Sequence, residues 1–180
     1  AGSTPAVAQE AAKAPARAQA AKPVDRDTKV RNDRKAFADS TDWIYNDLAS
    51  AQRAARTSNK PLMIVFRCIP CEACQEFDDD VARRDPVIRD LLDRFVCVRI
   101  VQANAIDLTH FQYDFDQSFH VILAMPDLTI LGRFGTRSER SEEEDISLQG
   151  LRRALRGALD LHDRFDAIRT SLAGKQARPT

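Results

Sequence analysis

Short apolar runs separated by polar turns predict the strands of a buried sheet. The run Leu62–Phe66 is continuously apolar, as expected for a strand that is covered on both faces. The stretch Phe95–Val101 predicts a second buried strand. Farther along, Val121–Ala124 and Thr129–Phe134 flank the turn segment Met125–Leu128, which is typical of a hairpin of two antiparallel strands.

Apolar residues at helical spacing predict helices between these strands, and polar residues before them can cap the helix ends. The expected helices are residues 43–60 capped by Asp42, residues 71–82, a helix capped by Asp85 that begins at Pro86, a short helix or turn at residues 107–115, and residues 148–174 capped by Ser147. The order of these elements predicts an α/β domain, in which a central mixed sheet carries helices on both faces.

The residues before the domain are poor in large apolar side chains. Residues 1–24 consist largely of alanine and proline, and a charged stretch follows from Asp25 to Lys35. Such a segment buries too little surface to offset the entropy lost on ordering. We therefore expect a disordered tail at residues 1–38, one domain at residues 39–173, and a short C-terminal tail at residues 174–180.

Composition narrows the classes of partner. The chain has 27 Lys plus Arg and 27 Asp plus Glu, so no overall field attracts it to nucleic acid or to an anionic membrane. It contains no apolar run long enough to span a bilayer. The chain begins at Ala1 without a methionine, which fits a mature product of export and leads us to expect a periplasmic or otherwise extracytoplasmic location.

Three of the four cysteines gather where the strand at residues 62–66 gives way to a helix. Cys71-Glu72-Ala73-Cys74 is a Cys-x-x-Cys motif, and Cys68 forms a second, overlapping motif with Cys71. A Cys-x-x-Cys pair in such a setting points to dithiol redox chemistry or to metal binding. A cysteine in the first turn of a helix gains thiolate character, because unpaired backbone N–H groups and the helix dipole favour an anion there.

The stretch from Trp43 to Val101 resembles thioredoxin-like domains. The matching features are Trp43, the apolar strand after Pro61, the Cys71 to Cys74 motif and the Asp85-Pro86-Val87 segment. The resemblance is to the exported bacterial type, which includes the C-terminal domain of the transmembrane thiol reductant carrier. It implies a thioredoxin fold and covers roughly residues 40–165.

The resemblance also implies an activity. In that family the first cysteine of the motif is the nucleophile and the second resolves the mixed disulfide, roles that fall here on Cys71 and Cys74. We expect a thiol-disulfide oxidoreductase or electron-passing protein that needs no cofactor and acts on thiol- or disulfide-bearing proteins. Arg67 would favour the thiolate and Glu72 would oppose it, so the pair should lean toward a reductant.

This sequence departs from the family pattern at two positions near the motif. The family carries a buried acid in the strand before the motif, and the matching residue here is Val65. The family also has a cis-proline facing the cysteines, where this chain has His120 just before Val121. The first difference removes the usual proton-transfer group, and the second affects how a substrate backbone would be aligned.

These departures leave two alternatives to a redox function. Cys68, Cys71, Cys74 and His120 together offer soft ligands for Zn, Cu(I) or an iron-sulfur cluster. A non-catalytic interaction domain is the other alternative. The fourth cysteine, Cys97, lies within the apolar run Phe95–Val101 and is expected to be a buried, inert thiol, with pairing to Cys68 as its alternative.

Overall fold

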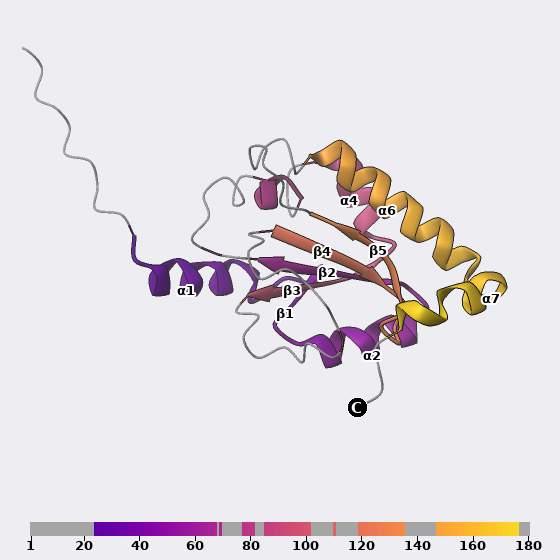
Figure 1. Ribbon diagram of the computed structural model, residues 1–180. Coiled ribbons are helices and arrows are strands. Elements are labelled where there is room, and N and C mark those ends of the chain that lie inside the picture. The colour runs from indigo at the N-terminus through magenta and orange to yellow at the C-terminus, as the bar shows by residue number, and fades with distance from the viewer. Residues whose placement is uncertain are drawn as a thin grey trace, which may run out of the picture.

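The two apolar runs become neighbouring strands at the centre of a five-stranded sheet (Figure 1). The computed structural model describes residues 24–67, 69, 77–81, 85–101, 110, 119–135 and 147–176. The strands are β1 (Trp43–Tyr45), β2 (Leu62–Arg67), β3 (Val96–Val101), β4 (Phe119–Ala124) and β5 (Ile130–Phe134). The helices are α1 (Arg26–Phe37), α2 (Leu48–Ser58), α4 (Pro86–Leu92), α6 (Leu148–Asp163) and α7 (Phe165–Ile168), followed by a 3₁₀ segment (Arg169–Lys175).

The sheet is mixed, with strand order β1-β3-β2-β4-β5. Strands β1, β3 and β2 run parallel, whereas β4 is antiparallel to β2 and β5 is antiparallel to β4. Every residue of β2 is buried, which confirms the prediction of a strand covered on both faces. The register places Val65 opposite both Arg99 on β3 and Val121 on β4.

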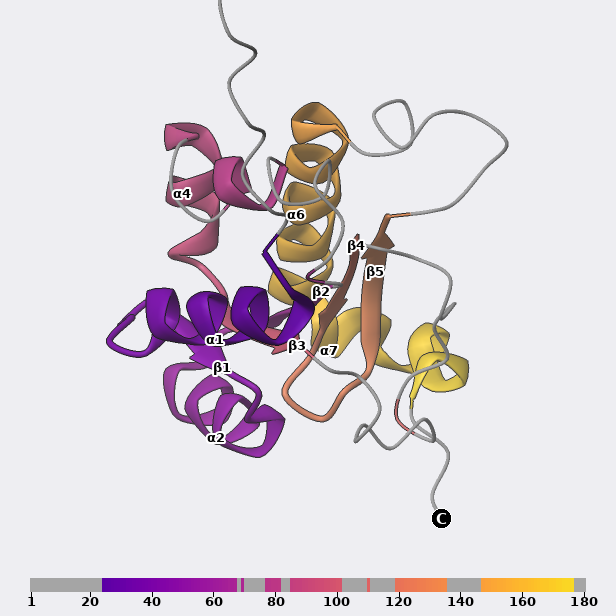
Figure 2. The ribbon, with the colours of Figure 1, turned by 90° about the vertical axis from the view of Figure 1, so that its left-hand side faces the viewer.

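Helices cover both faces of the sheet, so the predicted α/β class is confirmed. Alternate residues of β2 point to opposite sides. Met63 and Val65 belong to a core cluster that includes side chains of α4 and α6, whereas Leu62, Ile64 and Phe66 pack with α2. Figures 1 and 2 show α6 and α2 on opposite sides of the strands.

Two predicted helix caps are confirmed. The Asp85 carboxylate accepts a hydrogen bond from the backbone N–H of Ile88 at 2.8 Å, and Pro86 is the first residue of α4. The Ser147 hydroxyl accepts one from the backbone N–H of Gly150 at 3.1 Å. The side chain of Asp85 is also paired with Arg152, so the start of α4 is linked to α6.

The predicted helix beginning at Trp43 is wrong in its first residues. Trp43–Tyr45 form strand β1, in which Trp43 is buried and lies opposite Cys97 of β3. The helix begins later, at Leu48, and its cap is Asp47 and not Asp42. Asn46 takes a left-handed conformation (φ 53°) between the two elements. Pairing with β3 has overridden the helical spacing of the apolar residues.

The expected disorder through residue 38 is also wrong for part of that segment. Arg26–Phe37 form helix α1, capped by Asp25 through the backbone N–H of Thr28. Phe37 is buried with its ring edge-on to Trp43, at a centroid distance of 6.3 Å. Helix α1 therefore packs against the domain, while residues 1–23 lie outside the described part. The other predicted domain limits stay predictions.

The last predicted helix is interrupted. It begins as expected after Ser147, but α6 ends at Asp163, and α7 and the 3₁₀ segment then continue to Lys175. Arg164 has a non-helical conformation (φ −108°, ψ 11°) at the junction. Of the helix predicted at residues 71–82, only residues 77–81 are described, and they are helical. Of residues 107–115, only His110 lies within the described part.

The corrected start of α2 yields a stability test with a matched control. Asp47→Ala should lower the free energy of unfolding by about 1 kcal/mol, because the carboxylate accepts hydrogen bonds from the side chain and backbone of Ser50. Asp42→Ala removes the same charge in the same segment and should cost less than about 0.5 kcal/mol. Urea unfolding of both variants measures the difference, and equal losses would contradict the assigned cap.

The same hydrogen bonds give this difference a pH dependence. They hold the pKa of Asp47 below its ordinary value of 3.8, the bond from the Ser50 hydroxyl contributing most. A carboxylate with a lowered folded pKa stabilises the fold at higher pH and loses that contribution as the pH falls through its folded pKa. The gap between the two variants should therefore shrink in unfolding curves recorded below pH 3.8.

Candidate functional site

The predicted thiol site lies between described elements. Cys68, Cys71, Glu72 and Cys74 are outside the described residues, so their predicted roles stay predictions. The structure describes what flanks them. Strand β2 ends at Arg67, directly before Cys68, and the helical residues 77–81 follow the motif.

A buried ion pair joins the described residues on either side of residues 68–76, which we call the cysteine segment. Arg67 Nε donates to Asp78 Oδ2 at 3.2 Å, and the two side chains are 2% and 5% exposed. Arg67 ends β2, whereas Asp78 belongs to the helical residues 77–81. The pair therefore joins Arg67 and Asp78, described residues on either side of the segment 68–76, at the C-terminal end of the central strand β2.

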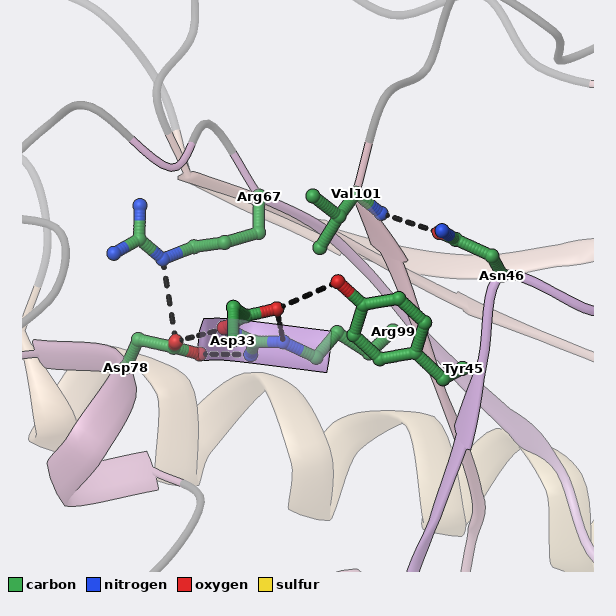
Figure 3. A network of polar contacts seen from close by, with 7 residues as sticks. All are labelled: Asp33, Tyr45, Asn46, Arg67, Asp78, Arg99 and Val101. Carbon is green, nitrogen blue, oxygen red and sulfur yellow. Dashed lines mark hydrogen bonds and ion pairs between the residues drawn. The ribbon is translucent and has the colours of Figure 1, made fainter. Parts of the chain in front are cut away.

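A second arginine joins Asp78 to the N-terminal helix. Arg99 of β3 is 1% exposed and forms a bidentate contact with Asp78, with Nη1–Oδ1 at 2.6 Å and Nη2–Oδ2 at 2.5 Å. It also donates to Asp33 of α1, from Nη2 to Oδ1 at 2.7 Å and from Nε to Oδ2 at 3.3 Å. Figure 3 shows Asp33, Asp78 and Arg99 meeting below Arg67. We call Arg67, Asp78, Arg99 and Asp33 the ion network.

Two aromatic side chains complete the surroundings of Arg99. The guanidinium carbon lies 4.4 Å from the centroid of the Phe37 ring, which adds a cation–π contact. The hydroxyl of Tyr45 donates to Asp33 Oδ2 at 2.8 Å. Burial opposes the charged form of Arg99, but the hydrogen bonds to Asp78 and Asp33 outweigh it and raise its pKa. Burial and the bond to Asp33 also raise the pKa of Tyr45.

Sequence reasoning anticipated only one member of the ion network. The sequence places Arg67 beside the cysteines, whereas no local pattern points to Asp33, Asp78 or Arg99. The available signal was Arg99 itself, since a charged residue inside an otherwise apolar strand demands buried partners. Which aspartates supply them depends on contacts 21 and 66 residues away in sequence, and these cannot be inferred from spacing alone.

Val65, at the position where the family carries a buried acid, lies in strand β2 as predicted. Val65 is fully buried on the same face of β2 as Met63, within the core formed with α4 and α6. Among the described residues, the buried acid is Asp78, which comes from a different element. Its carboxylate is bonded to both arginines of the ion network.

His120 lies on the other face of the sheet. It is buried in β4 opposite Phe66, and the two rings are 6.2 Å apart. Its neighbours Phe119 and Val121 pack with the opposite core, on the side of Asp78. No peptide bond in the described ranges is cis. Gly135 approaches this point with a φ of 94°, and a Cβ there would lie 2.4 Å from the carbonyl oxygen of Phe119.

The metal-binding alternative cannot be assembled from the described residues. Three of its four ligands lie outside them, and His120 alone is placed. Across the described ranges, no group of three His, Cys, Asp or Glu side chains has the geometry to hold a metal ion. The ligand set Cys68, Cys71, Cys74 and His120 therefore stays a prediction.

Cys97 is a free, buried thiol, as its apolar surroundings predicted. The alternative, a disulfide with Cys68, is wrong. Cys97 lies opposite Met63 and Trp43, toward the start of β2, whereas Cys68 follows the last residue of that strand. Burial, with smaller contributions from the charges of Asp42 and Asp93, raises its pKa to about 12.

This pKa predicts a thiol that does not react while the protein is folded. At pH 8, Cys97 should be alkylated roughly a thousandfold more slowly than an exposed cysteine, because the thiolate is the reacting species. Mass mapping after iodoacetamide treatment, with and without urea, measures this ratio. Modification at an exposed-thiol rate without urea would contradict the buried position.

Comparison with known proteins completes the description of the site. A family model described as thioredoxin-like matches residues 43–126, from the start of β1 to just beyond β4. No curated protein matches the chain significantly. In the described part of the chain, no helix has the length and apolar character that crossing a bilayer requires. The matched region and the five-stranded mixed sheet agree, so residues 43–126 are similar to a thioredoxin-like domain, and the structure fits an α/β thioredoxin-like fold.

Proposed function

We propose that this protein is a thiol-disulfide oxidoreductase or an electron-passing thioredoxin-like protein that uses Cys71 and Cys74. The observation that carries the proposal is the thioredoxin-like match, because it spans the segment with both cysteines. A second observation supports it. The Arg67–Asp78 ion pair holds the flanks of that segment together at the end of β2.

The proposed reaction is thiol-disulfide exchange in two steps. The thiolate of Cys71 attacks one sulfur of a substrate disulfide, forms a mixed disulfide and releases the other substrate sulfur as a thiolate, which takes up a proton. The thiolate of Cys74 then attacks the sulfur of Cys71 and releases the second substrate thiol. The protein is left with a Cys71–Cys74 disulfide, which a thiol reductant returns to the dithiol.

The charges near the end of β2 bear on the direction of this exchange. Arg67 and Arg99 lie on one face of the sheet and favour nearby anions, but Asp78 and Asp33 offset them. A thiolate there would gain only a modest stabilisation from the ion network. This balance of charges supports a cysteine pair that acts as a reductant or electron carrier. The negative charge of Glu72 is expected to oppose thiolate formation at the neighbouring Cys71.

The partners and the compartment belong to the same proposal. We propose other thiol- or disulfide-bearing proteins as partners, because the exchange chemistry requires a second sulfur pair. An extracytoplasmic location is proposed with it, since a protein disulfide persists there more readily than in the cytosol. Fractionation of the native host, with detection of the chain in the periplasmic or secreted fraction, tests the location.

Single serine variants test the assignment of the nucleophile. Cys71→Ser should reduce turnover of a small disulfide by more than about 100-fold, because it removes the sulfur that forms the covalent intermediate. Cys68→Ser is the matched control, a substitution of the same kind in the same segment, and should retain most activity. Turnover is measured with dithiothreitol as reductant and a chromogenic disulfide as substrate.

The metal content of the purified protein separates the alternatives. Stoichiometric zinc or copper, or the absorbance of an iron-sulfur cluster, in a protein that does not turn over disulfides would overturn the redox proposal in favour of a metal-binding module. Equal loss of turnover in the Cys68 and Cys71 variants would contradict the assignment of Cys71. A metal-free protein without exchange activity in any form would indicate a non-catalytic domain.

A further inference from the structure

The ion network reaches from helix α1 to the residue before the cysteine segment. Asp33 contacts Arg99, Arg99 contacts Asp78, and Asp78 contacts Arg67 (Figure 3). Each link is a direct hydrogen-bonded ion pair, and three of the four side chains are no more than 5% exposed. The four groups carry two positive and two negative charges.

Only one of these charges comes from outside the thioredoxin-like match. Arg67, Asp78 and Arg99 lie within residues 43–126, whereas Asp33 belongs to α1, before the matched region. Without Asp33 the other three groups carry one net positive charge in the protein interior. Burying a charge is costly unless it is paired, and the carboxylate that α1 supplies offsets part of that cost for Arg99.

Asp33 is held in place by contacts from several elements. Arg99 of β3 makes two hydrogen bonds to its carboxylate, and Tyr45 of β1 makes a third. Phe37, one turn along α1, stacks over the guanidinium of Arg99. Arg34 of the same helix also acts on this site, since its charge opposes the rise in the pKa of Tyr45.

We propose that Asp33 is a positioning residue for the thiol site, acting through Arg99 and Asp78. Its carboxylate neutralises Arg99 and leaves Asp78 able to pair with Arg67, the residue directly before the cysteine segment. Through Asp33, helix α1 thereby sets the local charge at the end of β2. The effect on thiol chemistry rests on the proposed function, whereas the charge coupling rests on the described contacts.

Removing the charge of Asp33 should change the reactivity of the thiols in a defined direction. Asp33→Asn leaves Arg67, Asp78 and Arg99 with a net positive charge, which favours a nearby thiolate. The pKa of the most reactive thiol should fall, and the disulfide should become easier to reduce. A fall of about one pKa unit makes alkylation at pH 5 about threefold faster, since the gain in thiolate is partly offset by lower nucleophilicity.

The experiment compares Asp33→Asn with Asp27→Asn in the full chain. Asp27 is exposed in the first turn of the same helix, so the control makes the same change in charge away from the ion network. The rate of iodoacetamide alkylation of each cysteine is mapped by mass spectrometry between pH 5 and 9, a range chosen to be about two units on either side of a typical lowered thiol pKa. The equilibrium with glutathione is measured on the same samples.

A double variant keeps the test valid if Asp33→Asn alone does not fold. Asp33→Asn combined with Arg99→Met leaves Arg67 and Asp78, whose charges cancel. Because the proposed effect is one of local charge, the alkylation profile should return to that of the wild type even where α1 loses its contact with β3. Tyr45→Phe keeps all four charges and removes only the hydroxyl bonded to Asp33, so its profile should match the wild type.

The possible outcomes separate the two proposals. An Asp33→Asn profile equal to that of Asp27→Asn, or a double variant that does not return to the wild-type profile, would overturn the positioning role of Asp33. A shifted profile in a protein that never turns over disulfides would retain the coupling and remove the proposed function. If the wild type turns over disulfides but Asp33→Asn does not shift the alkylation profile, the proposed function stands and the positioning role of Asp33 is removed.

Discussion

The structure depends on the burial of one positive charge. Arg99 lies in the parallel strand β3 with 1% of its side chain exposed, where an unpaired guanidinium would cost several kcal/mol. Two carboxylates satisfy it, Asp78 from the helical residues after the cysteine motif and Asp33 from α1. Because the two carboxylates belong to different elements, their pairing with Arg99 fixes where α1 and the helical residues 77–81 contact the sheet. The same contacts place the end of β2, through Arg67, beside them.

The parts of the fold that could be predicted from sequence are those with local signals. The signals for β2, an apolar run, and for the starts of α4 and α6, the caps Asp85 and Ser147, involve only residues close together in sequence. Strand β1 has only three residues, and it exists because it pairs with β3, more than fifty residues later. Helix α1 is mostly polar, and its place on the domain depends on Phe37 and Asp33. Long-range contacts of this kind leave no periodic pattern.

The candidate site divides in the same way. Residue identity and spacing located the cysteine motif, and the resemblance to thioredoxin-like domains pointed to apolar Val65 at the position of the family's acid. The sequence did not reveal that a buried carboxylate is present nearby from another element, in Asp78. It also did not show that His120 faces the α2 side of the sheet, since that depends on the register of β4. Among the described residues, the ion network lies at the end of β2, where the segment with the motif begins, and it includes Asp33 from a helix outside the matched region.

Native-state hydrogen exchange of α1 tests most directly whether Arg99 holds this helix on the domain. An isolated helix of 12 residues is marginal in water, so strong protection of its amides must come from docking. We predict that the amides of the last two turns of α1, around Asp33 and Phe37, exchange with protection comparable to that of β3, and that Arg99→Met removes the protection in α1 first. Exchange of α1 at the rate of a free peptide in the wild-type protein would contradict the account.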